Sequence, residues 1–327
     1  MNLVVTLTEG ADPAAVGRIL ATLGLWVEPL KGAGGRVEAL AVVPPSPPVD
    51  AALLAEVPGI ARVLSTGSAH PRVDGQAQHS VAIGHTRLGP GEAPVLIAGP
   101  CSVESEATAH AAAARVAAAG AKLLRGGAFK PRTSPYAFQG AGHDALGWLR
   151  AAADAHGLGV VTEVLSERDV GAVAEVADLL QIGSRNMQNF ALLRTAGAAG
   201  RPILLKRGFA ATVEEWLLAG EHALAAGAPA VIFCERGVRG FDSTTRNFLD
   251  ISAVALLAHV HGLPVVVDPS HATGRRDLVP ALAAAARAAG AHGVMVETHP
   301  DPGSARSDGP QALTVAELAA VAKAVLV

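Results

Sequence analysis

Four residues of types that bind divalent metals stand at, or shortly after, predicted strand ends in the second part of the chain. They are a thiol, an imidazole and two carboxylates, at Cys101, His271, Glu297 and Asp308. A shell of sulfur, nitrogen and oxygen donors suits manganese, iron, cobalt or zinc, and the sequence does not choose among them. Each residue alone also has an ordinary structural explanation, such as a small buried cysteine or a solvated loop carboxylate. Together, at adjoining strand ends, they predict a site for a divalent metal ion.

Basic residues follow the same strand ends and predict the binding of anionic substrates. This set comprises Arg125, Lys130, Arg132, Arg185, Lys206, Arg207 and Arg236. Arginine forks match phosphate and carboxylate oxygens, whereas lysine supplies a point charge. The hydroxyls of Thr133 and Ser134 are candidates to complete a phosphate cradle. A run of charge is usually a solvated face, but these residues alternate with Gly and Pro at strand ends, which favours a binding site.

The elements that must position these residues are eight apolar segments separated by Ala-rich helical patterns. The strand candidates are residues 95–98, 122–125, 160–163, 179–182, 203–206, 230–234, 264–268 and 293–297. Near-continuous apolar runs indicate parallel strands buried on both faces. Eight such units over residues 93–327 predict an α/β fold, a closed (β/α)8 TIM barrel whose functional residues gather where strands end. The alternative, an open doubly wound sheet, usually has a Gly-rich dinucleotide loop where this chain has Gly99-Pro100-Cys101-Ser102.

Residues 1–66 predict a small separate domain. Strand patterns at 3–7, 25–30, 36–43 and 60–65 alternate with helical patterns at 12–23 and 50–56. The order βαββαβ is that of the ferredoxin-like fold. A packing module and a ligand-sensing regulatory domain fit this pattern equally well. Residues 67–92 are polar and rich in His, Gly and Pro, which is typical of a linker, and 79–83 are expected to form a short strand at the barrel floor.

Composition excludes several other functions. The 327 residues fit a barrel of roughly 250 residues with a small added domain. A net charge of -3 and 3% aromatic residues argue against nucleic-acid binding. No apolar stretch is long enough to predict a membrane span, and the N-terminus lacks the pattern of a signal peptide. The two cysteines, Cys101 and Cys234, suit a reducing cytoplasm, and Cys234 is expected to serve packing.

The motifs around these residues resemble those of the 3-deoxy-D-arabino-heptulosonate 7-phosphate (DAHP) synthases, specifically the type I beta group with an N-terminal ferredoxin-like domain. The matching segments are residues 99–105, 124–136, 181–183, 185–189, 205–208, 234–237, 268–271 and 307–309. The similarity runs through the barrel and, more weakly, over the first 66 residues. The run Lys130-Pro131-Arg132-Thr133-Ser134 distinguishes this family from the 3-deoxy-octulosonate 8-phosphate synthases, which share the barrel and phosphoenolpyruvate.

The resemblance implies the condensation of phosphoenolpyruvate with erythrose 4-phosphate, the first step of the shikimate pathway. It implies that Cys101, His271, Glu297 and Asp308 hold the metal, and that Arg125, Lys130, Arg185, Lys206 and Arg236 bind phosphoenolpyruvate. Arg132, Thr133 and Ser134 would hold the sugar phosphate, with Asp268 near the sugar hydroxyls. Ser184 departs from the alanine usual in the family. It is harmless if only its backbone N–H is used, whereas its hydroxyl would alter phosphate affinity slightly.

The resemblance also bears on mechanism and control. Lys130 is the expected proton donor to the developing alkoxide, with His271 or a water on the metal as competing candidates. Residues 1–66 suggest feedback inhibition by tyrosine or phenylalanine in a homotetramer. Two other functions stay open: an octulosonate synthase that uses arabinose 5-phosphate, and a non-catalytic regulatory barrel that binds sugar phosphates or a partner protein.

Overall fold

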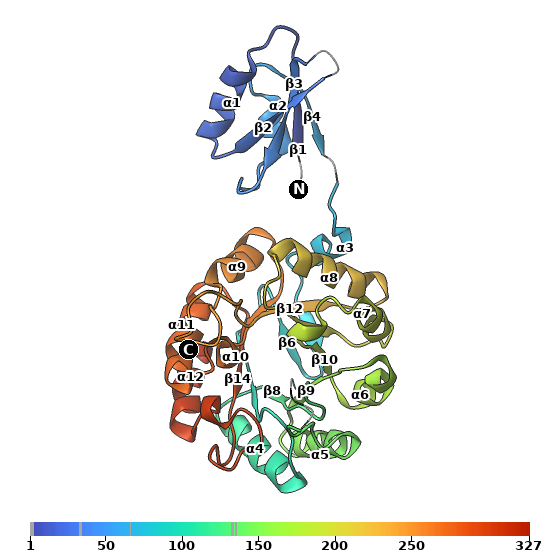
Figure 1. The fold of residues 1–327 in the computed structure, drawn as a ribbon, viewed down its shortest axis with the longest axis vertical. Coiled ribbons are helices and arrows are strands. Elements are labelled where there is room, and N and C mark those ends of the chain that lie inside the picture. Colours follow the sequence, from blue (N-terminus) through green and yellow to red (C-terminus); the bar gives the residue numbers. More distant parts are fainter. Residues whose placement is uncertain (1–2, 33–34, 66, 132–133, 135) are drawn as a thin grey trace. The chain divides into compact units, whose positions relative to one another are not determined.

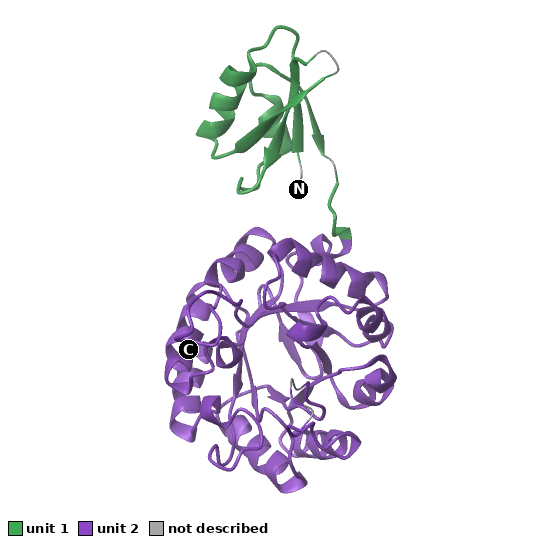
Figure 2. Cartoon of the chain, in the orientation of Figure 1, with its two compact units in different colours: residues 1–71 green, residues 72–327 purple. Residues whose placement is uncertain are grey.

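The computed structural model describes residues 3–32, 35–65, 67–131, 134 and 136–327. The chain divides into two compact units, residues 1–71 and residues 72–327, which Figure 2 distinguishes by colour. Among the described residues, no helix has both the length and the apolar character needed to cross a lipid bilayer.

The first unit is a four-stranded antiparallel sheet with helices packed against it. Its strands are β1 (Leu3–Leu7), β2 (Trp26–Lys31), β3 (Val37–Val43) and β4 (Ile60–Ser65), in the sheet order β2-β3-β1-β4, and its helices are α1 (Pro13–Thr22) and α2 (Ala51–Ala55). Both helices begin after an aspartate whose carboxylate accepts a backbone N–H, Asp12 for α1 and Asp50 for α2. The unit has its own apolar core, in which Val5, Leu20 and Leu54 are fully buried. The element order is the predicted βαββαβ.

The second unit is a closed barrel of eight parallel strands, in the order β10-β11-β12-β13-β14-β7-β8-β9. The strands are β7 (Val95–Gly99), β8 (Leu123–Arg125), β9 (Gly159–Glu163), β10 (Leu179–Ile182), β11 (Ile203–Lys206), β12 (Val231–Glu235), β13 (Val265–Val267) and β14 (Gly293–Glu297). This confirms the predicted barrel. The strand β13 is shorter than predicted because Pro264 has no N–H for the ladder, whereas Asp268 caps the following helix.

Helices surround the strands, as Figure 1 shows. They are α4 (Glu106–Ala118), α5 (His143–Asp154), α6 (Val170–Val176), α7 (Phe190–Gly197), α8 (Val213–Ala225), α9 (Ile251–Ala255), α10 (Pro269–Thr273), α11 (Val279–Ala288) and α12 (Val315–Leu326). A π-helical turn, Leu256–Val260, extends α9. Short 3-10 helices are η1 (Glu167–Asp169), η2 (Ser184–Asn186), η4 (Arg276–Leu278) and η5 (Gly309–Gln311). The strand residues are almost all buried because these helices cover the outer face of the barrel.

The segment that precedes the barrel belongs to the second unit. After α3 (Pro71–Asp74), the strands β5 (Val81–Ile83) and β6 (Thr86–Leu88) form an antiparallel hairpin. Val81, Ile83 and Leu88 join the apolar cluster formed inside the barrel, and Leu88 lies against Gly293, the first residue of β14. The hairpin therefore closes the end of the barrel where the strands begin. One short strand was predicted there, and the structure adds a second.

His292, just before β14, generates a prediction about stability. Its Nδ1 accepts the Val265 N–H at 3.2 Å, and burial together with Arg287 lowers its pKa from 6.5 to about 4. Between these two pH values the unfolded chain binds the proton more readily than the folded chain. We therefore expect His292 to make its full contribution to the free energy of unfolding above about pH 6.5. As the pH falls toward 4, the free energy of unfolding should decrease by about 1–2 kcal/mol, a figure that allows for the partial exposure of the His292 ring.

Urea unfolding of the wild type and of His292→Asn at pH 7 and pH 5 measures this contribution. The asparagine oxygen keeps an acceptor but does not titrate in this range, so the variant should lose less stability on acidification. An equal loss in both proteins would contradict the assignment.

Candidate active site

The four predicted metal ligands converge at the carboxyl ends of three adjacent strands. Cys101 follows β7, His271 lies in α10 after β13, Glu297 ends β14, and Asp308 lies in the loop after β14. One donor atom from each residue lies within 4.8 Å of the other three. The Cys101 thiol donates to Asp308 Oδ2 at 3.2 Å, and His271 Nε2 lies 3.2 Å from Glu297 Oε1. Barrel closure brings these residues together although 207 positions separate Cys101 from Asp308.

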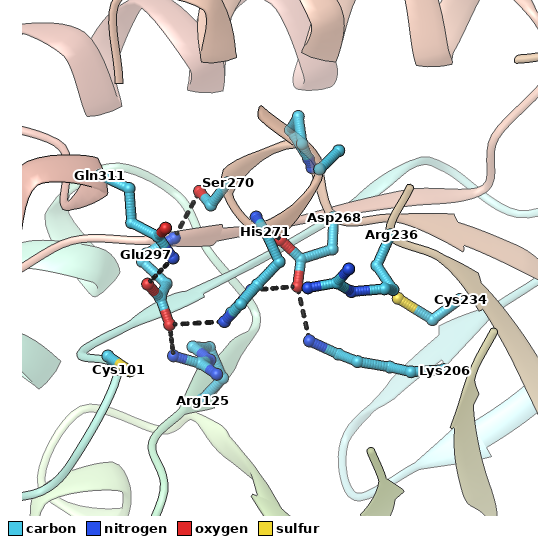
Figure 3. A network of polar contacts seen from close by, with 12 residues as sticks. Cys101, Arg125, Lys206, Cys234, Arg236, Asp268, Ser270, His271, Glu297 and Gln311 are labelled. Atoms are coloured by element: carbon cyan, nitrogen blue, oxygen red, sulfur yellow. Dashed lines mark hydrogen bonds and ion pairs between the residues drawn. The ribbon is translucent and has the colours of Figure 1, made fainter. Parts of the chain in front are cut away.

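The helix that follows β13 fixes the orientation of His271. Asp268 caps this helix by accepting the backbone N–H of His271 on Oδ1 at 3.0 Å, and its Oδ2 lies 2.7 Å from His271 Nδ1. Lys206 Nζ lies 2.5 Å from the same Oδ2, as Figure 3 shows. A carboxylate on one ring nitrogen leaves the other nitrogen directed at the cluster, which is the usual support of a metal-binding histidine.

Glu297 is almost completely buried and has three partners besides His271. Arg125 donates to its Oε1 at 2.8 Å, Gln311 Nε2 donates to its Oε2 at 2.6 Å, and its backbone N–H donates to Ser270 Oγ at 3.0 Å (Figure 3). Neither Gln311 nor Ser270 was predicted to support the site. Ser270 adjoins His271 in the matched motif, whereas no pattern in the sequence marks Gln311.

The charges of the cluster fit a divalent cation. Burial and the neighbouring Glu297 raise the pKa of the Cys101 thiol to about 12, although Lys130 opposes this shift. Burial would raise the pKa of Asp308, but His271 and the bond from Cys101 outweigh it, so the pKa is about 2. The thiol therefore keeps its proton beside two carboxylates. A divalent cation would stabilise the thiolate, so the donor set fits such an ion.

A cavity of about 430 Å³ adjoins this cluster. Eight residues predicted to form the site line it, namely Arg125, Lys130, Ser184, Arg185, Lys206, Arg236, His271 and Asp308. Residues that were not predicted also line it: Glu163, Gln181, Phe209, Arg239, Arg246 and Asn247. Arg239 and Arg246 lie several residues beyond the end of β12, so their position follows from the path of the loop and not from the strand pattern.

The cations of the cavity fall into two groups. Arg125, Lys206 and Arg246 form ion pairs with Glu297, Asp268 and Asp308 respectively. Lys130 donates to the carbonyl of Cys101 at 2.9 Å. Within the described residues, Lys130, Arg185, Arg236 and Arg239 form no ion pair. Basic side chains therefore outnumber acidic ones in the lining of the cavity.

The structure corrects the prediction for Arg207 and describes only part of the predicted sugar-phosphate site. Arg207, predicted to join the basic ring, is absent from the cavity lining and forms ion pairs with Glu235 at 3.0 Å and Asp250 at 2.7 Å. Neighbouring residues of a strand point to opposite faces, so Lys206 and Arg207 diverge. Ser134 is exposed, and its hydroxyl accepts the N–H of Tyr136 at 3.3 Å. Arg132 and Thr133 lie outside the described residues.

Two further predictions concern residues beside the cavity. Asp268 does not line it but holds Lys206 and His271, which do. Cys234 is buried in the apolar cluster inside the barrel, which confirms its expected packing role.

The fold and the site together define a (β/α)8-barrel protein with a candidate metal centre beside a cationic cavity. A sequence model of the DAHP synthetase I family matches residues 73–326. The chain therefore belongs to the DAHP synthetase I family.

Individual relatives agree with this family. A phospho-2-dehydro-3-deoxyheptonate aldolase of Thermotoga maritima is 52% identical over 206 residues, which cover 63% of this chain and 61% of that protein, less than two thirds of its length. The crystal structure of a Thermotoga maritima protein of the same name matches with a TM-score of 0.76 and 40% identity, over 98% of this chain and 95% of that one. A 2-dehydro-3-deoxyphosphooctonate aldolase of Acidithiobacillus ferrooxidans is 34% identical, over 58% of this chain and 73% of that protein.

The cluster geometry predicts that Cys101 is required for metal binding. Wild-type protein titrated with Co²⁺ should develop the absorption typical of a thiolate–cobalt bond. Cys101→Ala should lack this band and should bind Co²⁺ more weakly. Loss of a residue that only supports a metal ligand weakens metal binding by about 10–100-fold, and we expect a larger loss here because Cys101 is itself a ligand. The control is Cys234→Ala, which removes the other thiol and should keep both the band and the affinity. An unchanged band in Cys101→Ala would contradict the assignment.

Proposed function

We propose that this chain is a DAHP synthase, which condenses phosphoenolpyruvate with erythrose 4-phosphate and water to give DAHP and phosphate. The observation that carries the proposal is one cavity that adjoins a set of four metal donors and is also lined by four cations that form no ion pair within the described residues. Both substrates are phosphate esters, so a site that holds them together needs uncompensated positive charge. A bound divalent cation would supply Lewis-acid activation of the aldehyde.

Phosphoenolpyruvate is assigned to the residues of the cavity wall. These are Arg125, Lys130, Ser184, Arg185, Lys206 and Arg236. The Ser184 hydroxyl is buried and has no hydrogen-bond partner among the described residues. A buried hydroxyl without a partner carries a desolvation cost that a phosphate oxygen would remove. This supports a direct contact of Ser184 with the substrate.

The sugar phosphate is assigned to Arg132, Thr133 and Ser134 by the family motif. These residues follow shortly after Lys130 in the sequence, and the side chain of Lys130 lines the cavity. Asp268 is assigned to the sugar hydroxyls. It is buried and already has three hydrogen-bond contacts, so it would orient the sugar through the oxygen capacity that remains.

In the proposed reaction, C3 of phosphoenolpyruvate attacks the aldehyde carbon of the sugar, and positive character develops at C2. Water adds at C2, and the resulting hemiketal phosphate breaks its C–O bond to release phosphate. Lys130 is the better candidate to protonate the new alkoxide. Its ammonium lies 2.9 Å from the carbonyl of Cys101, whereas both ring nitrogens of His271 already face carboxylates. Burial also lowers the pKa of His271, although Asp268 and Glu297 oppose this shift.

The acceptor sugar separates the two enzyme functions and is tested directly. Chelator-treated protein receives manganese, phosphoenolpyruvate and either erythrose 4-phosphate or arabinose 5-phosphate, and released phosphate is measured. We expect release only with metal and only with the four-carbon sugar. Release with the five-carbon sugar would indicate an octulosonate synthase. No release with either sugar, in protein that binds metal, would favour a non-catalytic barrel.

We also propose that residues 1–71 form a regulatory domain for tyrosine or phenylalanine within a homotetramer. Support comes from the separate apolar core of this unit and from the match to the Thermotoga maritima structure over 98% of this chain. A truncated form of that relative also has a solved structure, which matches 76% of this chain with a TM-score of 0.70.

Deletion of residues 1–71 tests the regulatory role. We expect the fragment 72–327 to keep phosphate release but to lose inhibition by tyrosine or phenylalanine, because its barrel has its own core. The intact chain, assayed with the same amino acids, is the control. Inhibition that persists in the fragment would place the effector site in the barrel.

A further inference from the structure

Phe209 contacts three arginines at the wall of the cavity. The guanidinium carbons of Arg236, Arg239 and Arg185 lie 4.7, 4.9 and 5.5 Å from the centroid of its ring. All three distances fall within the range of about 6 Å in which a cation is attracted by an aromatic ring. Strong contacts of this kind occur only about once per 70–80 residues. Three on one ring therefore need a specific explanation.

These four residues come from three neighbouring strands. Arg185 lies in η2 after β10, Phe209 follows β11, and Arg236 and Arg239 follow β12. The backbone N–H of Arg239 donates to the carbonyl of Phe209 at 2.7 Å, which joins the loops after β11 and β12. The group therefore occupies the arc β10–β11–β12 of the barrel mouth, whereas the metal donors occupy the arc β13–β14–β7.

The arginines of this group have no direct acidic partner among the described residues, although Asp268 and Glu235 act on Arg236 from a longer distance. Within the described residues, Arg185, Arg236 and Arg239 form no ion pair, whereas Arg125 and Arg246 on the same cavity do. Arg236 is only 5% exposed, so its charge is also poorly solvated. Three like charges around one ring repel one another, and the ring offsets this repulsion only in part. A dianionic group bound between them would remove it.

We propose that Phe209 is a positioning residue that holds Arg185, Arg236 and Arg239 as a preformed cradle for a phosphate dianion, with Arg239 as an additional direct ligand. The inference rests on the proposed function, because it assigns this cradle to the phosphate group of phosphoenolpyruvate. The aromatic ring fixes the guanidinium planes before the ligand arrives, so less side-chain freedom is lost on binding.

The test is calorimetric titration of the full-length chain with inorganic phosphate, phosphoenolpyruvate and erythrose 4-phosphate, each alone. Phe209→Leu removes the aromatic face but keeps an apolar side chain. We expect it to bind phosphate and phosphoenolpyruvate at least about tenfold more weakly, because all three cation–ring contacts are lost. Phe209→Tyr keeps an aromatic face and should stay within about threefold of the wild type.

Two controls separate positioning from a general structural effect. Phe190→Leu replaces the first residue of α7, a phenylalanine that contacts His222, and it should leave anion affinity unchanged. Arg239→Gln should weaken phosphate binding in the wild type but much less in Phe209→Leu, because the two residues act through one cradle. If Phe209→Leu lowers the melting temperature, Phe209→Met replaces it in the same titrations.

Each outcome decides the proposal. Wild-type affinity for phosphate and phosphoenolpyruvate in Phe209→Leu, or additive losses in the double variant, would overturn it. A loss confined to erythrose 4-phosphate would assign the cradle to the sugar and overturn the phosphoenolpyruvate assignment. If the phosphate effects appear as expected but neither sugar supports phosphate release, the cradle stands and the proposed enzyme function fails.

Discussion

A continuous line of ionisable side chains, from Lys206 through Asp268, His271 and Glu297 to Arg125, is the feature on which the site depends. Taking such groups out of water costs several kcal/mol for each ion, and the cost is offset only when every charge keeps a close partner. Removing one member would leave its neighbour buried and unpaired. Because the line crosses from β11 to β8 through β13 and β14, it also ties the strand ends around the mouth to one another.

The cavity joins two electrostatic environments. On the arc β13–β14–β7, two carboxylates, an imidazole and a thiol gather as candidate metal ligands. On the arc β10–β11–β12, three arginines gather around Phe209. The proposed condensation of an aldehyde with phosphoenolpyruvate would use both environments. Closure of the barrel brings the two arcs to the same mouth.

The strand ends approach one another closely at the mouth, and small residues permit this. Gly99, the last residue of β7, lies so near Arg125 that a Cβ at this position would be 1.9 Å from the carbonyl oxygen of Arg125. Cys101 follows two residues later, so the space that Gly99 leaves open helps to bring the thiol toward Glu297 and Asp308. Glycine is needed at position 99 because the two backbones approach each other closely there.

The sequence alone determined the eight apolar strands, the polar residues at their ends and hence the four-donor cluster, because strand periodicity and the loop geometry of parallel barrels are local rules. The separate βαββαβ unit followed from the same kind of pattern. Only the tertiary structure decided which neighbours complete the site. Arg239 and Arg246 lie in a loop, and Gln311 lies in the short helix η5, in segments whose path no periodicity fixes. Lys206 and Arg207 point to opposite sides although both are basic. Side-chain partners across long loops depend on packing of the whole barrel, so they are absent from any local pattern.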